Sequence, residues 1–141
     1  MELRSGPLDP WRELAAYPAR RPSLRGRAGA TAVFVGSMRE FNRGRAVTAM
    51  TLEHYPGMTE KHLERLCAEA RERWTLLDVL LIHRVGEIRP EEPIVLVAAW
   101  SAHRADALSA CRYLIDELKT RAPFWKQEQT GAGRRWVEPG G

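Results

Sequence analysis

The sequence predicts an α+β fold, an antiparallel or mixed sheet with its helices packed on one face. Two segments repeat apolar residues at helical spacing, and two others are almost continuously apolar, as strands buried on both faces are. The predicted order of elements is β-β-α-β-β-α, with hairpins between the helices. This order favours an α+β sandwich over a doubly wound parallel sheet.

The chain is expected to divide into two parts. Its 141 residues, 44% hydrophobic and 28% charged, are typical of a globular protein. Residues 1–29 are rich in Pro and Gly and predict an irregular basic arm with one short turn at residues 11–16. Residues 30–141 are expected to form a single domain. The longest apolar run, Ile94–Trp100, is too short to span a bilayer.

In the first half of this domain, a β-favouring run at residues 30–35 is closed by Gly36. A polar loop at residues 39–45 leads to a second strand at residues 46–54. After a Pro-Gly turn, helical periodicity predicts a helix over residues 60–74, with Thr59 as its N-cap. The pattern is therefore strand, polar loop, strand and helix.

In the second half, residues 76–85 and 94–101 predict a hairpin of two central strands, joined by a turn that contains Gly and Pro. Residues 104–121 then place apolar side chains on one face of a second helix, which Ala122-Pro123 ends. Trp136 and Val137 predict a last short strand.

The charge is unevenly distributed along the chain. The net charge is +4, and no acidic residue lies between Glu13 and Glu40, a stretch that contains several arginines. This bias favours a phosphate-bearing partner or an acidic protein surface, and a solvated basic arm is the equally weighted alternative. The N-terminus has no secretory signal, and there is no cysteine framework, so a cytoplasmic protein is expected.

The most informative feature is a pair of lysines near the C-terminus. Lys119 and Lys126 stand seven residues apart across Pro123, and an aromatic pair and a carboxylate flank the second. Each ammonium group would depress the pKa of the other if both faced one pocket, as catalysis by an amine requires. The alternative for Lys119 is a helix-ending lysine that complements the helix dipole. Two such amines suggest an anionic or carbonyl-bearing substrate.

Two further segments could bind an anion. His103-Arg104 opens the second helix, where backbone N–H groups attract phosphate, although a plain helix-start role is the alternative. Gly36-Ser37-Met38-Arg39 ends a strand, where amides and an arginine can reach a ligand together, or form an ordinary turn. His83-Arg84 is weaker, because a histidine inside an apolar strand is more often structural.

The remaining candidates carry no chemistry. Cys67 and Cys111 fall at apolar positions of the helices and are expected in the core as inert thiols. No metal-ligand spacing joins the histidines, and no phosphate-binding or dinucleotide fingerprint occurs, so neither a metal nor a cofactor is expected.

Five strings in the same order closely resemble the family of molybdopterin synthase catalytic (large) subunits, the MoaE family. They are Phe34-x-Gly36-x-Met38-Arg39, Leu52-Glu53-His54-Tyr55-Pro56-Gly57-Met58, Ile82-His83-Arg84-Val85-Gly86, Ser101-Ala102-His103-Arg104 and Lys119-Thr120-Arg121-Ala122-Pro123-Phe124-Trp125-Lys126. The resemblance covers residues 30–137, and residues 1–29 contribute little to it.

The resemblance implies an α/β-hammerhead-like fold and a sulfurtransferase of molybdenum cofactor biosynthesis. Such an enzyme converts cyclic pyranopterin monophosphate to molybdopterin by inserting two dithiolene sulfurs. The sulfur arrives as a thiocarboxylate on the C-terminal Gly-Gly of a small ubiquitin-like carrier subunit, whose tail enters the large subunit. Two large subunits form a homodimer within a heterotetramer, without nucleic acid or membrane, and residues 30–141 would be the catalytic domain.

The resemblance also implies residue roles. Lys119 would lie beside the incoming thiocarboxylate and either stabilise an oxyanion or move a proton, with Lys126 as the second pocket lysine. Arg39 and His103-Arg104 would hold the substrate phosphate and pterin, the latter pair across the dimer. Residues expected to line the same pocket are Ser37, Met38, Ile115, Gln127 and Glu128.

Two alternatives remain open on the residues alone. A non-enzymatic RNA- or phosphate-binding module would explain the basic arm, although no aromatic strand motif of that class occurs. A carrier-binding scaffold without activity would keep the groove, but Lys119 and Lys126 are present. The terminal Gly140-Gly141 resembles a carrier tail, and without a ubiquitin-like domain before it a frayed end is the preferred interpretation.

Overall fold

The computed structural model describes residues 1–42, 45–121, 123–131 and 133–137. The elements in chain order are β1 (Glu2–Arg4), α1 (Pro10–Ala16), two 3₁₀ turns η1 (Pro18–Arg20) and η2 (Pro22–Leu24), β2 (Ala30–Ser37), β3 (Phe41–Asn42), β4 (Arg45–His54), α2 (Met58–Arg73), β5 (Asp78–Arg84), β6 (Gly86–Ile88), β7 (Pro93–Ser101), α3 (Arg104–Thr120), β8 (Phe124–Thr130) and β9 (Gly133–Val137). No helix among them is long and apolar enough to cross a membrane.

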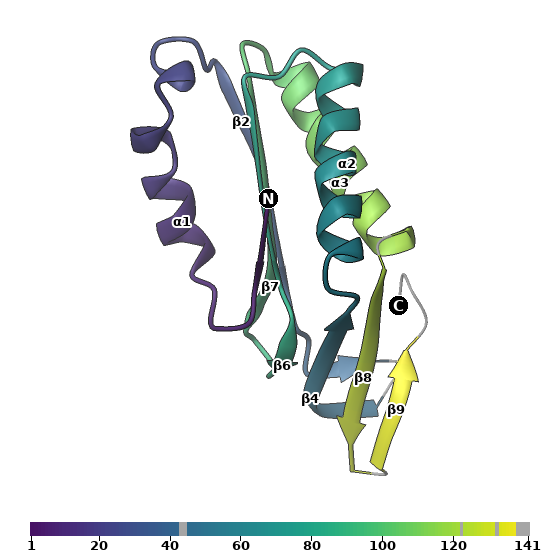
Figure 1. Cartoon of the computed structure of the whole chain (residues 1–141). Coiled ribbons are helices and arrows are strands. Elements are labelled where there is room, and N and C mark those ends of the chain that lie inside the picture. Colours follow the sequence, from purple (N-terminus) through teal and green to yellow (C-terminus); the bar gives the residue numbers. More distant parts are fainter. Residues whose placement is uncertain (43–44, 122, 132, 138–141) are drawn as a thin grey trace.

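The four-stranded sheet has the strand order β1-β5-β7-β2 and lies between two layers (Figure 1). The pairs β5–β7 and β7–β2 are antiparallel, whereas β1 adds to β5 in parallel. Helices α2 and α3 cover one face, as the sequence predicts, and the N-terminal segment with α1 covers the other (Figure 1).

The two central strands are buried on both faces, which confirms the prediction from their continuous apolar runs. Along β5, Val79 and Leu81 pack against α2 and α3, and the alternate residues Leu80 and Ile82 pack beneath the N-terminal segment. Every residue of β5 is buried. This arrangement gives the sheet a rigid centre, because neither face can move without opening a packed layer.

The prediction that residues 1–29 are irregular is wrong. Residues 2–4 form β1, and residues 10–16 form a helix that Asp9 caps with its side chain and Pro10 opens. Leu8 and Leu24 are buried against the sheet, and Tyr17 stacks on Trp100 at 5.2 Å between ring centroids. The helix has only seven residues, so its local periodicity was too short to recognise.

A buried carboxylate fastens this segment to the sheet. Asp78 is fully buried and accepts hydrogen bonds from Arg21 Nε at 2.7 Å, Arg71 Nη2 at 2.9 Å and Tyr17 Oη at 3.1 Å. Burial alone would raise the pKa of Asp78, but these bonds and the Val79 N–H hold it below its ordinary value. Arg21 of the basic N-terminal segment therefore pairs with a carboxylate of the same chain.

A second, five-stranded sheet, with the order β3-β4-β8-β9 and β6 beside β4, projects from the lower end of the four-stranded sheet (Figure 1). Strand β8 pairs with β4 and β9, and the short β6 also pairs with β4. The strand predicted at Trp136-Val137 is confirmed within β9, whereas β8 and β6 were not predicted. Residues 43–44 of the predicted loop and the terminal Gly140-Gly141 lie outside the described residues.

Helix α2 is confirmed, but the role predicted for Thr59 is wrong. The helix begins at Met58 with Gly57 as its N-cap, and the Gly57 N–H donates to Glu60 Oε2 at 2.9 Å. Thr59 lies inside the helix, fully buried. Its hydroxyl accepts from the Tyr55 N–H at 3.0 Å and donates to the Pro123 carbonyl at 3.1 Å. Thr59 therefore joins the start of α2 to the segment that enters β8.

The substitution Asp78→Asn should destabilise the protein by about 2–3 kcal/mol at neutral pH, because a neutral amide cannot bind both guanidinium groups. Since the folded-state pKa of Asp78 is depressed, its contribution is complete above the unfolded value of about 3.9 and is lost as the pH falls below it. Urea unfolding of both proteins at several pH values measures this, and the two stability curves should converge in acid.

The matched control is Asp116→Asn, which removes the partner of Arg112 in an exposed pair on α3. Its effect should stay below about 0.5 kcal/mol. An Asp78→Asn protein as stable as this control would show that the carboxylate does not fasten the N-terminal segment.

Candidate functional site

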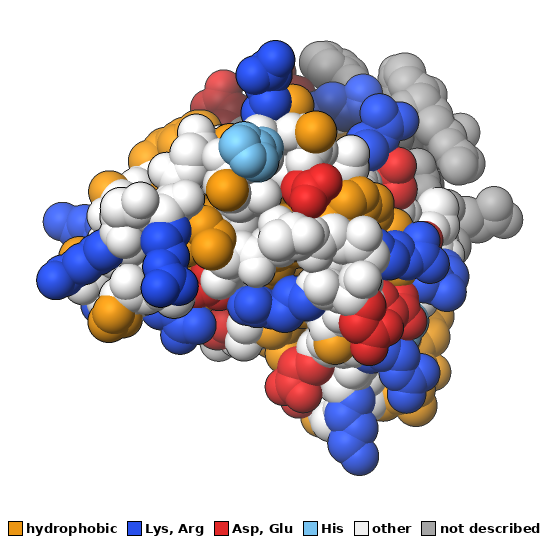
Figure 2. Space-filling model, turned by 90° about the horizontal axis from the view of Figure 1, so that it is seen from above, with side chains coloured by type: hydrophobic (Ala, Val, Ile, Leu, Met, Phe, Trp, Pro, Cys, Tyr) orange, Lys and Arg blue, Asp and Glu red, His pale blue; other side chains and the backbone are white. Residues whose placement is uncertain are grey.

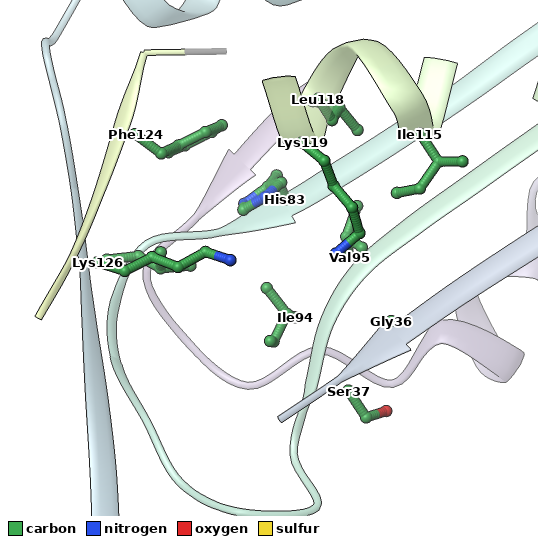
Figure 3. A pocket seen from close by; sticks show the side chains of 11 residues that line it. Gly36, Ser37, His83, Ile94, Val95, Ile115, Leu118, Lys119, Phe124 and Lys126 are labelled. Carbon is green, nitrogen blue, oxygen red and sulfur yellow. The ribbon is translucent and has the colours of Figure 1, made fainter. Parts of the chain in front are cut away.

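A cavity of about 90 Å³ lies where the two sheets meet. Its lining comes from five strands and one helix: Gly36 and Ser37 of β2, Leu52 of β4, His83 of β5, Ile94 and Val95 of β7, Ile115, Leu118 and Lys119 of α3, and Phe124 and Lys126 of β8. Most of these side chains are apolar, and the polar ends of His83, Lys119 and Lys126 converge on the same space (Figure 3). The cavity therefore has a mostly apolar wall with a few polar groups that face its interior, as ligand sites do.

The two predicted lysines both reach this cavity. Lys119 comes from the last turn of α3 and Lys126 from the third residue of β8, and their amines extend toward one another across it (Figure 3). Lys119 is exposed and lies at the mouth, whereas Lys126 is half-buried. The chain reversal between α3 and β8 brings the two side chains together.

The environment of Lys126 favours its neutral amine. Burial lowers the pKa of Lys126, the like charge of Lys119 lowers it further, and Glu128 opposes both effects. A lysine with a lowered pKa can give or accept a proton more readily at neutral pH. The pair is thus suited to stabilising a developing negative charge or to moving a proton.

His83 forms part of the cavity wall, although the sequence favoured a purely structural role. Its ring stacks on Phe124 with centroids 4.1 Å apart and an interplanar angle of 14°. Its Nδ1 lies 2.7 Å from the Arg84 carbonyl oxygen. Burial lowers the pKa of His83 to about 4, and the charges of Lys126 and Lys119 act in the same direction. The alternation of side chains along β5 was the signal that could have placed it here.

The residues that end β2 are only partly in the cavity. Ser37 lines it, but Met38 is buried beside Met50, Leu52 and Ile88. The backbone of Met38 bonds to the 89–92 turn, with its N–H 3.0 Å from the Glu92 carbonyl oxygen. Arg39 is exposed one residue further on. Contacts of Met38 and Arg39 with substrate stay predictions.

The two residues after Lys126, Gln127 and Glu128, lie on opposite faces of β8. Glu128 is buried, and its charge acts on Lys126. Gln127 points to the opposite face of β8, where it lines a shallow polar hollow with Thr51, Glu87 and others. Of the two, Glu128 has the electrostatic link to Lys126. Neither residue is among those that line the cavity, and their contacts with substrate stay predictions.

His103 and Arg104 lie at the other end of α3 from the lysines. Lys119 lies 15 positions after Arg104, which amounts to about 22 Å of helix. Both residues are exposed. Figure 2 looks onto this end of the molecule and shows Lys and Arg side chains spread around its edge. Within one chain, they are too far from the cavity to share its ligand.

Neither cysteine belongs to this site. Cys111 is buried, and burial raises the pKa of its thiol to about 11. Burial also raises the pKa of Cys67. Both thiols pack in or against the core under α2 and α3, as the sequence predicts, so neither is a nucleophile for cavity chemistry. Within the described residues, no three His, Cys, Asp or Glu side chains gather to hold a metal ion.

Comparison with known proteins gives one consistent relationship. The family model described as MoaE protein matches residues 6–121. The molybdopterin synthase catalytic subunit of Ralstonia nicotianae is 53% identical over 126 residues, which are 89% of this chain and 69% of that protein. The protein of the same name from Pseudomonas aeruginosa is 50% identical over 138 residues, 98% of this chain and 89% of that protein. The solved molybdopterin biosynthesis MoaE protein from Burkholderia ambifaria has a TM-score of 0.81 at 46% identity, covering 99% of this chain and 89% of that chain.

The substitution Lys119→Met should raise the pKa of Lys126, because it removes the like charge that now disfavours the ammonium form. Amine labelling followed by mass spectrometry, or NMR of isotopically labelled lysine, measures this pKa across a pH series. In Lys61→Met, which alters an exposed residue of α2, Lys126 should titrate as it does in the unmodified protein. An unchanged Lys126 titration in Lys119→Met would mean that the two amines do not share the cavity.

Proposed function

The chain belongs to the MoaE family of molybdopterin synthase catalytic subunits, and we propose that its two-lysine cavity is the place where sulfur enters the cofactor precursor. The observation that carries this proposal is the convergence of Lys119 and Lys126 on a cavity with otherwise largely apolar walls. Its substrate is cyclic pyranopterin monophosphate, and its product is molybdopterin with two dithiolene sulfurs. The reaction needs no thiol of this chain, which fits a buried Cys111 and a half-buried Cys67 whose thiols both have a raised pKa.

The sulfur donor is the thiocarboxylate at the C-terminal Gly-Gly of a small ubiquitin-like subunit. A narrow, mostly apolar cavity suits a tail of glycines, which bring no side chains into it. After the sulfur has bonded to the precursor, water adds to the glycine carbonyl carbon and negative charge develops on the carbonyl oxygen. The carbon–sulfur bond then breaks, the sulfur stays on the precursor, and the tail is left as a carboxylate. The Lys119 ammonium at the mouth is placed to stabilise this oxyanion, and Lys126, with its lowered pKa, to exchange a proton.

The complete site requires a second copy of the chain. Arg104 and Lys119 are separated by about 22 Å of helix, so a phosphate held by His103-Arg104 cannot also contact the lysines of the same chain. In a homodimer, one protomer would supply the lysine cavity and its partner the anion-binding helix start. The assembly is then a dimer of large subunits with a small subunit at each cavity, and the cytoplasm is its expected compartment.

The alternative of a non-enzymatic RNA- or phosphate-binding module is not supported. The family relationship indicates an enzyme subunit. Arg21, one of the arginines that suggested a free basic arm, is engaged in an ion pair with Asp78 at 2.7 Å. The division into residues 1–29 and a catalytic domain of residues 30–141 stays a prediction.

The substitution Lys119→Ala should reduce dithiolene formation by at least about a hundredfold, because it removes the charge that faces the developing oxyanion. The assay combines the purified chain, the precursor and the thiocarboxylated small subunit, and measures molybdopterin. Lys61→Ala, on the exposed side of α2, should match the unmodified protein. Full turnover by Lys119→Ala, with its oligomeric state intact, would remove the role assigned to this lysine.

Mixed dimers test whether the site is shared between protomers. Lys119→Ala and Arg104→Ala proteins should each be nearly inactive. Unfolding and refolding them together produces dimers in which one cavity has an intact Lys119 and receives an intact Arg104 from the partner protomer. About a quarter of the normal activity should return, since half the dimers are mixed and each has one complete site. No recovery, with mixed dimers demonstrated by mass spectrometry, would place both residues in one protomer's site.

A further inference from the structure

His83 holds a fixed position in the wall of the cavity. Its strand, β5, is one of the two central strands of the four-stranded sheet, and only 8% of the residue is exposed. The ring is held on one side by Phe124, at 4.1 Å between centroids and 14° between planes. Figure 3 shows it between the amines of Lys119 and Lys126 and the ring of Phe124. A side chain so constrained presents its ring atoms in one orientation.

The hydrogen bond to the main chain determines which ring nitrogen carries the proton. Nδ1 lies 2.7 Å from the Arg84 carbonyl oxygen, and a carbonyl oxygen can only accept. Nδ1 must therefore carry the hydrogen. In the neutral imidazole the other nitrogen, Nε2, then has a lone pair and accepts hydrogen bonds.

The surroundings keep the imidazole neutral. Burial lowers the pKa of His83 to about 4, and the two lysine charges also disfavour a third positive charge in the same cavity. At neutral pH the ring therefore does not become a donor at both nitrogens. The cavity wall contains ammonium groups, which only donate, and an imidazole nitrogen, which only accepts.

The other side chains that line the cavity offer few hydrogen-bond acceptors, so Nε2 of His83 matters for any ligand that has a donor group. Leu52, Ile94, Val95, Ile115 and Leu118 offer no polar side-chain atom, and Ser37 is exposed at the end of β2. A substrate that fills the cavity loses water from any N–H or O–H group that faces these aliphatic side chains. Such a group needs an acceptor, and Nε2 of His83 is positioned to provide it.

We propose that Nε2 of His83 accepts a hydrogen bond from an N–H or O–H group of the reacting heterocycle and so orients it between Lys119 and Lys126. His83 is then a substrate-positioning residue, and the proton stays on the substrate. The inference rests on the proposed function, because it takes the cavity to be the place where the pterin precursor reacts. It adds a recognition contact that distinguishes a donor-bearing ring from one that lacks the donor.

Three substitutions separate the two ring nitrogens. In His83→Gln, the longer side chain can place its amide oxygen near the position of Nε2, so the acceptor is retained. In His83→Asn, the shorter amide can reach the Arg84 carbonyl in place of Nδ1, but no acceptor faces the cavity. His83→Phe keeps only the stacking on Phe124. Single-turnover assays with saturating thiocarboxylated small subunit and varied precursor give the rate and the KM for each protein.

His83→Gln should stay within about threefold of the unmodified kcat/KM, whereas His83→Asn and His83→Phe should lose about tenfold or more. Binding of the small subunit should be the same in all three. Equal losses of kcat/KM in His83→Gln and His83→Asn, or full activity in His83→Phe, would overturn the proposal. The unmodified protein and Lys119→Ala are assayed in parallel, because an inactive unmodified protein would refute the proposed function instead.

A measurement on the unmodified protein keeps the test valid if a variant fails to fold. Long-range ¹H–¹⁵N NMR of protein labelled at histidine should show His83 with its proton on Nδ1 at neutral pH. Addition of cyclic pyranopterin monophosphate alone should shift the Nε2 resonance toward the value of a hydrogen-bonded nitrogen. A proton on Nε2 before addition, or an Nε2 signal that saturating precursor leaves unchanged, would contradict the proposal.

Discussion

The repulsion between two ammonium groups in one small cavity is the constraint on which the site depends. Burial lowers the pKa of Lys126, and the charge of Lys119 lowers it further. Such a pair persists only if the backbone holds both side chains in place, with an acid nearby. The buried Glu128 is this acid, two residues after Lys126 on the same face of β8. An incoming carboxylate-like group would relieve the repulsion, which gives the cavity its preference for an anion.

The framework around the pair is built from contacts distant in sequence. The Thr59 hydroxyl bonds to the Pro123 carbonyl and so fixes the segment between α3 and β8. Strand β8 pairs with β4 from His54 to Val47 and positions Lys126 relative to Leu52. In the four-stranded sheet, Asp78 holds the N-terminal segment in place through its hydrogen bonds to Tyr17 and Arg21. The cavity floor is therefore rigid before any ligand arrives, as electrostatic stabilisation of a transition state requires.

The sequence predicted β4, both long helices and three strands of the four-stranded sheet (β2, β5 and β7), because periodicity and apolar runs report directly on burial. It did not reveal β8, since the inward-facing positions of that strand carry Lys126 and Glu128 where a core strand would be apolar. Functional chemistry thus replaced the pattern that marks a strand. The N-terminal helix was missed for another reason: it is short and stabilised mainly by Leu8 and Leu24 packing on residues far along the chain.

In the candidate site, too, some residues could be predicted from the sequence and others could not. The resemblance named Lys119 and Lys126, and strand alternation separates Glu128 from Gln127 once β8 is known. The position of His83 in the wall depends on the stacking of Phe124 and on a main-chain bond, neither of which leaves a local sequence signal. His103 and Arg104 lie at the other end of α3 from the cavity, and their contact with a ligand in the partner protomer's cavity stays a prediction.

The central claim is that the two amines receive the tail of another protein. A crystal structure of this chain with a small ubiquitin-like subunit ending in Gly-Gly tests it most directly. The account predicts that the terminal glycine carboxylate lies within about 3 Å of Lys119 Nζ, with Lys126 lining the same cavity. A tail that ends elsewhere on the surface, with both lysines turned toward bulk water, would contradict it.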